Sequence, residues 1–176
     1  MEICKCQTSY LLQKNGTFIE VNGCKHTLHV PSTTHLVAIL RYHLELTGTK
    51  ISCEIGRCDA CSVLVNGSVA ASCLVMAYQI HQTSITTIEG LSVGAKLHPI
   101  QQAFLEEGGF QCGYCTPGMI ISVKALLDAD PTPTQEKITE ALSGNLFRCT
   151  GYGGIIRAVQ KANTYIKAAE ERRNQP

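Results

Sequence analysis

The spacing of the cysteines constrains this chain more than any other feature, because 10 of its 176 residues are cysteine. Four of them, Cys53, Cys58, Cys61 and Cys73, follow one another closely. The first residues, MEICKCQTSY, lack the basic start and the apolar stretch of an export signal. We therefore expect a cytoplasmic protein. Disulfides are rare in that reducing compartment, so metal binding explains this many cysteines better than disulfide pairing does.

The first ligand set begins in the segment CEIGRCDAC, which spans Cys53–Cys61, and Cys73 follows after eleven residues. A C-x4-C-x2-C run with a distant fourth cysteine is typical of the plant-type [2Fe–2S] cluster. A short loop can curl three thiolates around two sulfide-bridged irons, with Gly56 letting the backbone come close, and a strand of the next hairpin can deliver Cys73. A Cys4 zinc site is the alternative, but zinc ribbons usually pair two C-x2-C units. Inert buried cysteines would not need this spacing.

A second candidate set contains three cysteines. QCGYCTPG places Cys112 and Cys115 just before an apolar stretch, and Cys149 lies in GNLFRCTGY, with 33 residues between it and Cys115. C-x2-C at a helix start also occurs in redox-active dithiols, because a helix N-terminus favours the thiolate. The other interpretation is a metal pocket between two loops that each lead into a helix. Cys4, Cys6 and Cys24 remain outside both sets.

The first half of the chain predicts a small α+β domain that ends near Gly90. Asn22-Gly23 and Asn66-Gly67 each separate two β-prone runs, which is a strong hairpin signal because both turn positions need positive φ. A helix over residues 36–44 follows the first hairpin. The predicted strands are residues 17–21, 24–30, 62–65, 68–73 and 84–88.

The second half changes character and predicts four helices. Gly108-Gly109 ends the first of them, Pro117 occupies an allowed first-turn position, and Thr134 caps the third. We therefore expect two domains, residues 1–90 and residues 91–176. The predicted helices lie around residues 100–105, 117–127, 134–142 and 155–172.

Composition excludes several classes of partner. Hydrophobic residues make up 44% of the chain and charged residues 16%, which suits a globular protein. The net charge of +1 leaves no basic surplus for nucleic acid. The apolar runs are too short and interrupted to span a membrane. We expect neither nucleic acid nor a membrane as a partner.

Six segments together resemble one family, and they cover nearly the whole chain beyond about residue 15. The chain is similar to the iron–sulfur subunits of the molybdenum hydroxylases, which include xanthine dehydrogenase, aldehyde oxidoreductase and carbon monoxide dehydrogenase. The resemblance implies an N-terminal β-grasp ferredoxin domain and a C-terminal four-helix domain, each with one [2Fe–2S] cluster. The segments are LTGTK (46–50), CEIGRCDACSVLVNG (53–67), SCL (72–74), TTIEGL (86–91), QCGYCTPGMI (111–120) and GNLFRCTGY (144–152).

The resemblance also implies a role. Such a chain is the electron-transfer subunit of an oxidoreductase and has no substrate site of its own. Electrons pass from molybdopterin in a large partner subunit through the Cys112, Cys115 and Cys149 site to the first cluster, and on to a flavin (FAD) subunit or another acceptor. In the family, Gln111 and Cys149 approach the pterin. Without the resemblance, Gln111 could equally be a solvated loop glutamine. The alternatives are a free-standing ferredoxin-like carrier or redox sensor, and a zinc-stabilised adaptor.

Two residues depart from the family pattern. Asp59 stands where the family has glycine, and Asp tolerates the left-handed backbone better than most residues. Phe147 replaces the first cysteine of the family's C-R-C, so the second cluster lacks one of its usual four ligands. The site could be empty or hold a labile cluster, another residue could supply the fourth ligand, or the substitution could damage the protein. We expect that the cluster persists in some form and that Cys4 and Cys6 do not supply the ligand, because ordering a terminal arm costs entropy.

Overall fold

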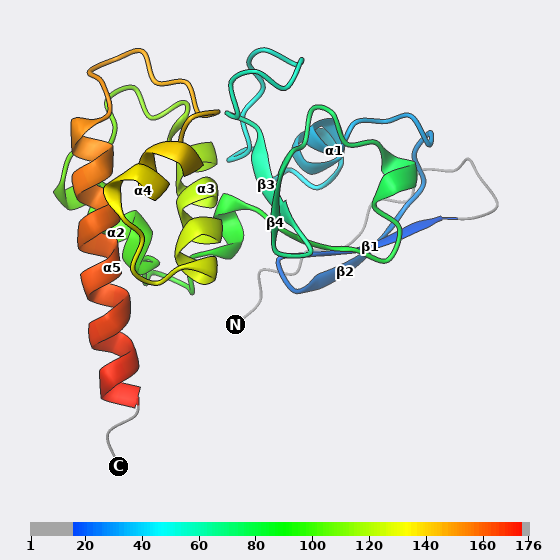
Figure 1. The fold of residues 1–176 in the computed structure, drawn as a ribbon. Helices are drawn as coiled ribbons and strands as arrows, with labels where there is room; N and C mark the ends of the chain where they lie inside the picture. Colours follow the sequence, from blue (N-terminus) through cyan, green and yellow to red (C-terminus); the bar gives the residue numbers. More distant parts are fainter. Residues whose placement is uncertain (1–15, 174–176) are drawn as a thin grey trace.

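The structure is a computed structural model and describes residues 16–173 (Figure 1). A mixed sheet with short helices occupies the first half, and longer helices follow in the second. The protein is therefore α+β, as the sequence predicts. Cys4 and Cys6 lie outside the described residues. Within residues 16–173, no helix combines the length and the apolar character needed to cross a membrane.

The sheet of the first half has five strands in the order β2-β1-β5-β3-β4. β1 and β5 pair in parallel, whereas β1 with β2, β3 with β4 and β3 with β5 pair antiparallel. Strand β5 thus joins two hairpins that are far apart in the sequence. The strands are β1 (Thr17–Val21), β2 (Cys24–Leu28), β3 (Ser62–Val65), β4 (Ser68–Ala71) and β5 (Ser84–Thr86).

Both predicted hairpins are confirmed. Asn22 and Gly23 have φ of 52° and 80°, and Asn66 and Gly67 have φ of 49° and 82°. Positive φ at both central residues matches the right-handed twist of the flanking strands. The Asn66 side chain also accepts a hydrogen bond from the Ser84 N–H at 2.9 Å, which attaches the second turn to β5.

Short helices cover one face of the sheet. α1 (Leu36–Ala38) continues directly into the π-helix η1 (Ile39–His43), and Leu36, Ile39 and Leu40 are fully buried against the strands. The 3-10 turns η2 (Ala77–Gln79) and η3 (Ile88–Gly90) flank β5.

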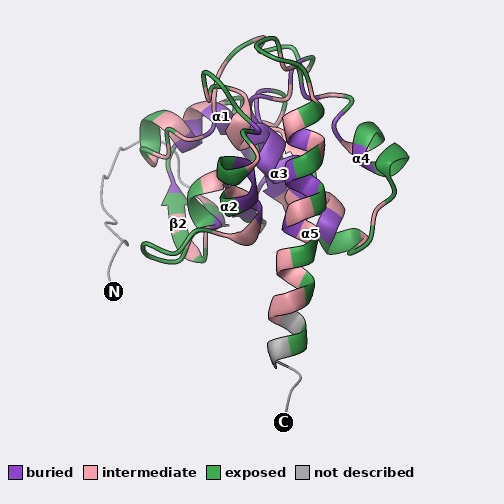
Figure 2. Cartoon of the chain, turned by 90° about the vertical axis from the view of Figure 1, so that its left-hand side faces the viewer, coloured by how far each residue is buried: buried purple, intermediate pink, exposed green. Residues whose placement is uncertain are grey.

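Four further helices form the second half of the described chain. Thr134 accepts a hydrogen bond from Lys137 N, so it caps its helix as predicted. Phe104, Met119 and Ile155 belong to a hydrophobic core that is distinct from the core under the sheet. Figure 2 shows buried residues along α3, at the centre of the view. The helices are α2 (Pro99–Glu106), α3 (Thr116–Ala129), α4 (Gln135–Ala141) and α5 (Gly153–Arg173).

The prediction for the end of the second hairpin is wrong. β4 ends at Ala71, so Cys73 lies in a turn and not on a strand. The Leu74 N–H donates to Ala71 O at 2.9 Å, and the Ser72 hydroxyl donates to Cys61 O at 2.6 Å. The Leu74–Ala71 bond closes a turn, and the Ser72–Cys61 bond holds that turn against the 53–61 loop, so Cys73 faces this loop. Likewise, β2 ends two residues earlier than predicted and β5 ends at Thr86.

Candidate metal centres

Three cysteine-bearing loops lie at the same end of the molecule. They are the loops before β3, before α3 and before α5, at the top of Figures 1 and 2. Helices and strands below them supply the buried cores, so the loops are held from one side only.

The loop of residues 53–61 bends through a series of left-handed residues. Glu54, Gly56 and Asp59 have φ of 57°, 68° and 48°. A Cβ on Gly56 would lie 2.4 Å from Leu74 Cδ1, so this glycine lets the loop approach the segment that carries Cys73. Asp59 holds the backbone conformation for which glycine would be the default residue, as the sequence predicts.

The four thiols of the first set form two neighbouring pairs. The Cys58 side chain interacts with the Cys53 thiol, and the Cys61 side chain interacts with the Cys73 thiol. Cys73 also interacts electrostatically with Cys53, so the two pairs are within reach of each other. Cys58, Cys61 and Cys73 are buried, whereas Cys53 is partly exposed. Two pairs of sulfur atoms side by side are the arrangement that a two-iron cluster requires.

The thiols of the first set differ in pKa because their surroundings differ. The N–H groups of Ile55 and Arg57 donate to Cys53 Sγ, the latter at 3.2 Å, and lower the pKa of this thiol to about 7. Burial is the main reason that the pKa of Cys73 rises to about 11. Metal binding replaces the thiol proton, so a bound cation would offset this burial cost. The N–H donors around Cys53 would remain directed at sulfur.

The second set places two exposed thiols in contact. Cys112 Sγ and Cys149 Sγ are 3.6 Å apart, although 37 positions separate them in sequence. Cys115 is half-buried at the N-cap of α3 and interacts electrostatically with Cys112, Cys149 and also Cys58. The Tyr114 N–H is the main cause that lowers the pKa of Cys112, whereas burial raises the pKa of Cys115. The loops before α3 and α5 therefore face each other, as predicted.

Phe147 is accommodated by the fold. Its half-buried ring packs against the helical core and meets Tyr152 edge-on, with the ring centroids 6.0 Å apart. The Phe147 N–H donates to the Tyr152 hydroxyl at 2.9 Å, and that hydroxyl donates to Asn145 O at 2.6 Å. The aromatic residue is thus a packed part of the loop before α5.

The two thiol sets are joined by direct backbone contacts. Leu146 N donates to Cys58 O at 3.2 Å, and Asn145 Nδ2 donates to Asp59 O at 3.4 Å. A Cβ on Gly118 would lie 2.2 Å from Asp59 O, so α3 needs glycine where it meets the first loop. Sequence reasoning missed this contact. In the sequence, only the glycines of TPG and GNLF point to a close contact, and they do not indicate that Asp59 is the residue they meet.

The remaining candidates occupy separate positions. Gln111 is exposed beside Cys112. Cys24 begins β2, far along the chain from both sets, and is disulfide-bonded, whereas the seven cysteines of the two sets are free thiols.

Thiol spacing tests whether a cluster fits. Two thiolates on one tetrahedral metal with bonds of about 2.3 Å lie roughly 3.7 Å apart. The 3.6 Å between Cys112 Sγ and Cys149 Sγ fits that spacing. Among the described side chains, no three His, Cys, Asp or Glu residues surround a position for a single metal ion.

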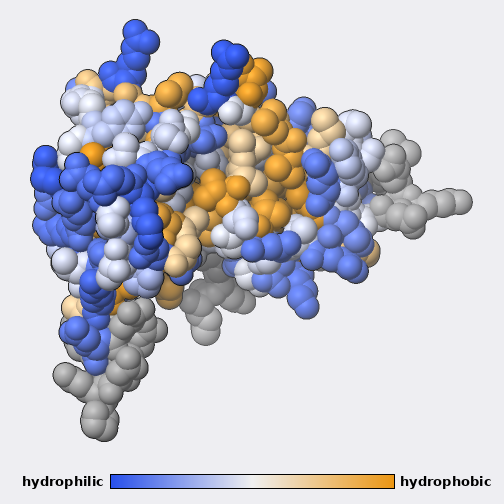
Figure 3. All heavy atoms as spheres, viewed as in Figure 1, coloured by the Kyte–Doolittle hydropathy of each residue, from blue (hydrophilic) through white to orange (hydrophobic). Residues whose placement is uncertain are grey.

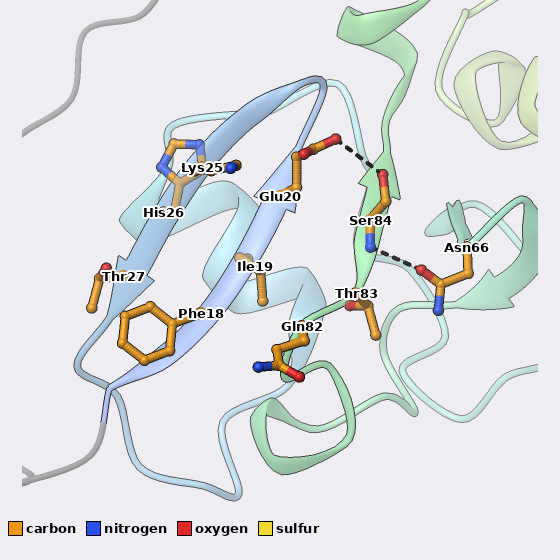
Figure 4. A pocket seen from close by; sticks show the side chains of 10 residues that line it. All are labelled: Phe18, Ile19, Glu20, Lys25, His26, Thr27, Asn66, Gln82, Thr83 and Ser84. Carbon is orange, nitrogen blue, oxygen red and sulfur yellow. Dashed lines mark hydrogen bonds between the residues drawn. The ribbon is translucent and has the colours of Figure 1, made fainter.

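A hollow of about 530 Å³ lies over the sheet, and no cysteine of the two thiol sets lines it (Figure 4). Its walls come mainly from β1, β2 and β5, and Asn66 and Ser84 close one side through their hydrogen bond. Phe18, Lys25 and His26 line the opposite part.

Comparisons with known proteins agree with the geometry. Residues 19–83 match the 2Fe-2S iron-sulfur cluster binding domain family, and residues 87–160 match the [2Fe-2S] binding domain family. The chain is 58% identical to a probable xanthine dehydrogenase subunit from Bacillus subtilis, covering 84% of each protein. It is 48% identical to the nicotine 6-hydroxylase small subunit of Paenarthrobacter nicotinovorans, covering 82% of this chain and 87% of that one.

Solved structures give the same result. A chain of quinoline 2-oxidoreductase from Pseudomonas putida 86 superposes with a TM-score of 0.84 at 39% identity, over 88% of this chain and 96% of that one. Aldehyde oxidoreductase from Desulfovibrio desulfuricans gives a TM-score of 0.85 at 37% identity, and the match spans 88% of this chain and 17% of that longer one. The chain therefore belongs to the iron–sulfur small-subunit family of the molybdenum hydroxylases, an oxidoreductase family whose small subunits bind [2Fe–2S] clusters.

Proposed function

We propose that this chain carries electrons between a molybdenum cofactor in a large partner subunit and a flavin subunit or another acceptor. The observation that carries the proposal is the contact between two thiol sets, through the hydrogen bond from Leu146 N to Cys58 O. One-electron transfer needs neighbouring centres, and this contact would place two of them side by side. The chain would bind no substrate itself.

The ligand assignment follows the thiol sets. Cys53, Cys58, Cys61 and Cys73 would hold one [2Fe–2S] cluster, and Cys112, Cys115 and Cys149 would hold the second. The sheet and its short helices, residues 1–90, would form a β-grasp ferredoxin domain. Residues 91–176 would form the four-helix domain. Two hydrophobic cores support this division, and Leu64 of β3 packs in the helical one at the boundary between the halves.

The clusters, when bound, supply the one-electron carriers, and the chain tunes and shields them. The N–H groups of Ile55 and Arg57 are directed at Cys53 Sγ and would stabilise negative charge on the reduced cluster. Burial of Cys61 and Cys73 would keep water from the inner side of the first cluster. The second set is more open, because Cys112 and Cys149 are exposed.

That exposure supports a direction for the relay. Electrons would enter at Gln111 and Cys149, which lie at the surface, and pass inward past Cys115 to Cys58. Cys115 interacts electrostatically with thiols of both sets, so it stands between them. The first cluster would then pass electrons to the acceptor.

Apolar surface near the thiols suits the attachment of a large subunit. Tyr114, Leu146 and Ile55 are 48%, 59% and 61% exposed, and all three lie within the cysteine loops. Figure 3 shows apolar side chains also gathered over β3 and β4, where Val69 and Leu74 are exposed. Exposed apolar patches mark interaction sites.

We place the complex in the cytoplasm.

Association tests the proposal. The chain, expressed with its neighbouring large-subunit gene, should co-purify with a molybdenum protein and be reduced by that protein's substrate, with bleaching of the iron–sulfur absorbance. A double variant that places charge on the apolar surface, Leu146→Glu with Tyr114→Glu, should lose the partner and keep the first cluster. Val93→Glu is the matched control, because Val93 is 80% exposed and lies outside the cysteine loops. A chain that stays alone and still accepts electrons from soluble donors would favour the free-standing carrier.

A further inference from the structure

We infer that the second cluster is asymmetric: Cys112 and Cys149 hold one iron, Cys115 is the only protein ligand of the other, and a small exogenous thiolate completes that iron. This inference rests on the proposed function, because it assumes a cluster at the second set. It explains how the site works without the cysteine that Phe147 replaces.

The first set shows what a complete site looks like in this chain. Its four thiols form the neighbouring pairs Cys53 with Cys58 and Cys61 with Cys73. In a [2Fe–2S] cluster each iron takes two thiolates, so each pair corresponds to one iron.

The second set contains one such pair and a single thiol. Cys112 Sγ and Cys149 Sγ are 3.6 Å apart, close to the separation of roughly 3.7 Å expected for two thiolates on one tetrahedral metal. Cys115 reaches these two thiols electrostatically but forms no comparable sulfur pair with either in the described chain. Its natural pair member would have been residue 147.

The two tyrosine hydroxyls of these loops are engaged in other hydrogen bonds. The Tyr152 hydroxyl accepts from Phe147 N and donates to Asn145 O, and the Tyr114 hydroxyl donates to Ile51 O. Asp59 is a competing carboxylate, because its Oδ2 packs against Gly144 of the loop that carries Cys149. Within the described part of the chain, burial alone shifts the pKa of Asp59, and no thiol of the second set contributes. Asp59 is therefore tested directly below.

A thiolate is the ligand that suits the remaining place on the second iron. Iron in clusters prefers soft sulfur ligands, and abundant low-molecular-weight thiols are present in reducing compartments. Cys112 and Cys149 are exposed and Cys115 is only half-buried, so the second set opens to solvent on one side. Binding is a ligand exchange: the thiol gives one proton to solvent, its sulfur bonds to iron, and no electron is transferred.

The test uses the full chain, reconstituted without oxygen from ferrous iron, sulfide and 2-mercaptoethanol, and then freed of the thiol. Wild type should fall from about four irons per chain toward about two, and the second EPR signal should return when 2-mercaptoethanol is added back. Phe147→Cys should keep about four irons and both signals without added thiol. Phe147→Ala is the matched control, because it removes the same ring without adding any donor atom, and it should behave like wild type.

A second measurement tests the inference on wild type alone, so that the result does not depend on how the variants fold. Replacing 2-mercaptoethanol with a small selenol should shift one of the two EPR signals of wild type and leave the other unchanged. If wild type keeps both signals after thiol removal and ignores the selenol, an internal ligand is present and the inference is wrong. Asp59→Asn and a Cys4→Ser, Cys6→Ser double variant would then identify it. If Phe147→Cys and wild type both hold about two irons under every condition, the proposed second cluster itself is wrong.

Discussion

At the scale of single residues, two positions define what is unusual about this chain. Asp59 and Phe147 both depart from the family pattern, and both lie at the contact between the thiol loops. Asp59 holds φ of 48°, and Phe147 packs on Tyr152. Each substitution therefore fits the local structure. Asp59 tolerates the left-handed backbone, and Phe147 packs against the ring of Tyr152.

Asp59 should affect the first cluster through its charge. Asp59→Asn removes a negative charge beside Cys58 and keeps a residue that accepts left-handed φ. The reduction potential of the first cluster should rise, because reduction adds negative charge that the carboxylate opposes. An EPR-monitored redox titration measures the change. Asp59→Val should instead destabilise the fold by about 1–2 kcal/mol, since a β-branched residue does not tolerate this conformation. An unchanged potential in Asp59→Asn would show that solvent screens the carboxylate.

The sequence could reveal these residues but not their surroundings. Comparison with the family motif identifies Phe147 as a lost ligand, and the general behaviour of Asp predicts that the 53–61 loop survives. The hydrogen bonds among Phe147, Tyr152 and Asn145 depend on how the loop before α5 folds back. No local pattern encodes that return, so only the structure shows that Phe147 is part of the packing.

At the scale of elements, close approach of α3 to the 53–61 loop joins the two halves. Gly118→Ala would place a Cβ 2.2 Å from Asp59 O, a backbone atom that cannot rotate away. Although alanine usually favours helix over glycine by about 1 kcal/mol, this variant should lower the free energy of unfolding. Gly153→Ala in the first turn of α5 is the matched control, because its nearest neighbour is Arg157 Nη1 at 3.7 Å. Chemical unfolding compares them, and equal stability of the two variants would contradict the contact.

The contact between α2 and α5 predicts a pH dependence. Hydrogen bonds from Gln102, Tyr165 and Lys161 lower the pKa of Glu106 from 4.5 to about 2. A lowered carboxyl pKa stabilises the fold above the unfolded-state value, and this stabilisation is lost as pH falls from about 4.5 to about 2. At pH 7 the Glu106→Gln variant should be less stable than wild type. Its stability should also fall less than that of wild type as the pH is lowered. Thermal unfolding from pH 7 to pH 3 measures both; parallel curves for the two proteins would contradict the assignment.

Local chemistry explains which elements the sequence predicts well. The Asn-Gly turns fix both hairpins, and Thr134 marks the start of α4. The prediction fails at Cys73, where Ser72 bonds to Cys61 O and ends β4 early. That bond joins residues eleven positions apart, so strand propensity alone extends the strand too far.

At the scale of the whole molecule, the chain is a support for two adjacent thiol sets at one end. Two separate cores lie below the loops, and the hydrogen bonds from Leu146 and Asn145 connect the sets across the halves. The sequence predicts each set from its spacing, but their adjacency depends on how the halves pack. This adjacency is what makes a relay the natural function.

The measurement that tests this account most directly is iron content with low-temperature EPR. The protein would be purified without oxygen, kept in a small thiol and reduced with dithionite. The account predicts about four irons per chain and two distinct signals that broaden each other, because the clusters are neighbours. About two irons and a single plant-ferredoxin-like signal would contradict it, since the Cys112, Cys115 and Cys149 site would then hold no cluster and the relay would lack its first step.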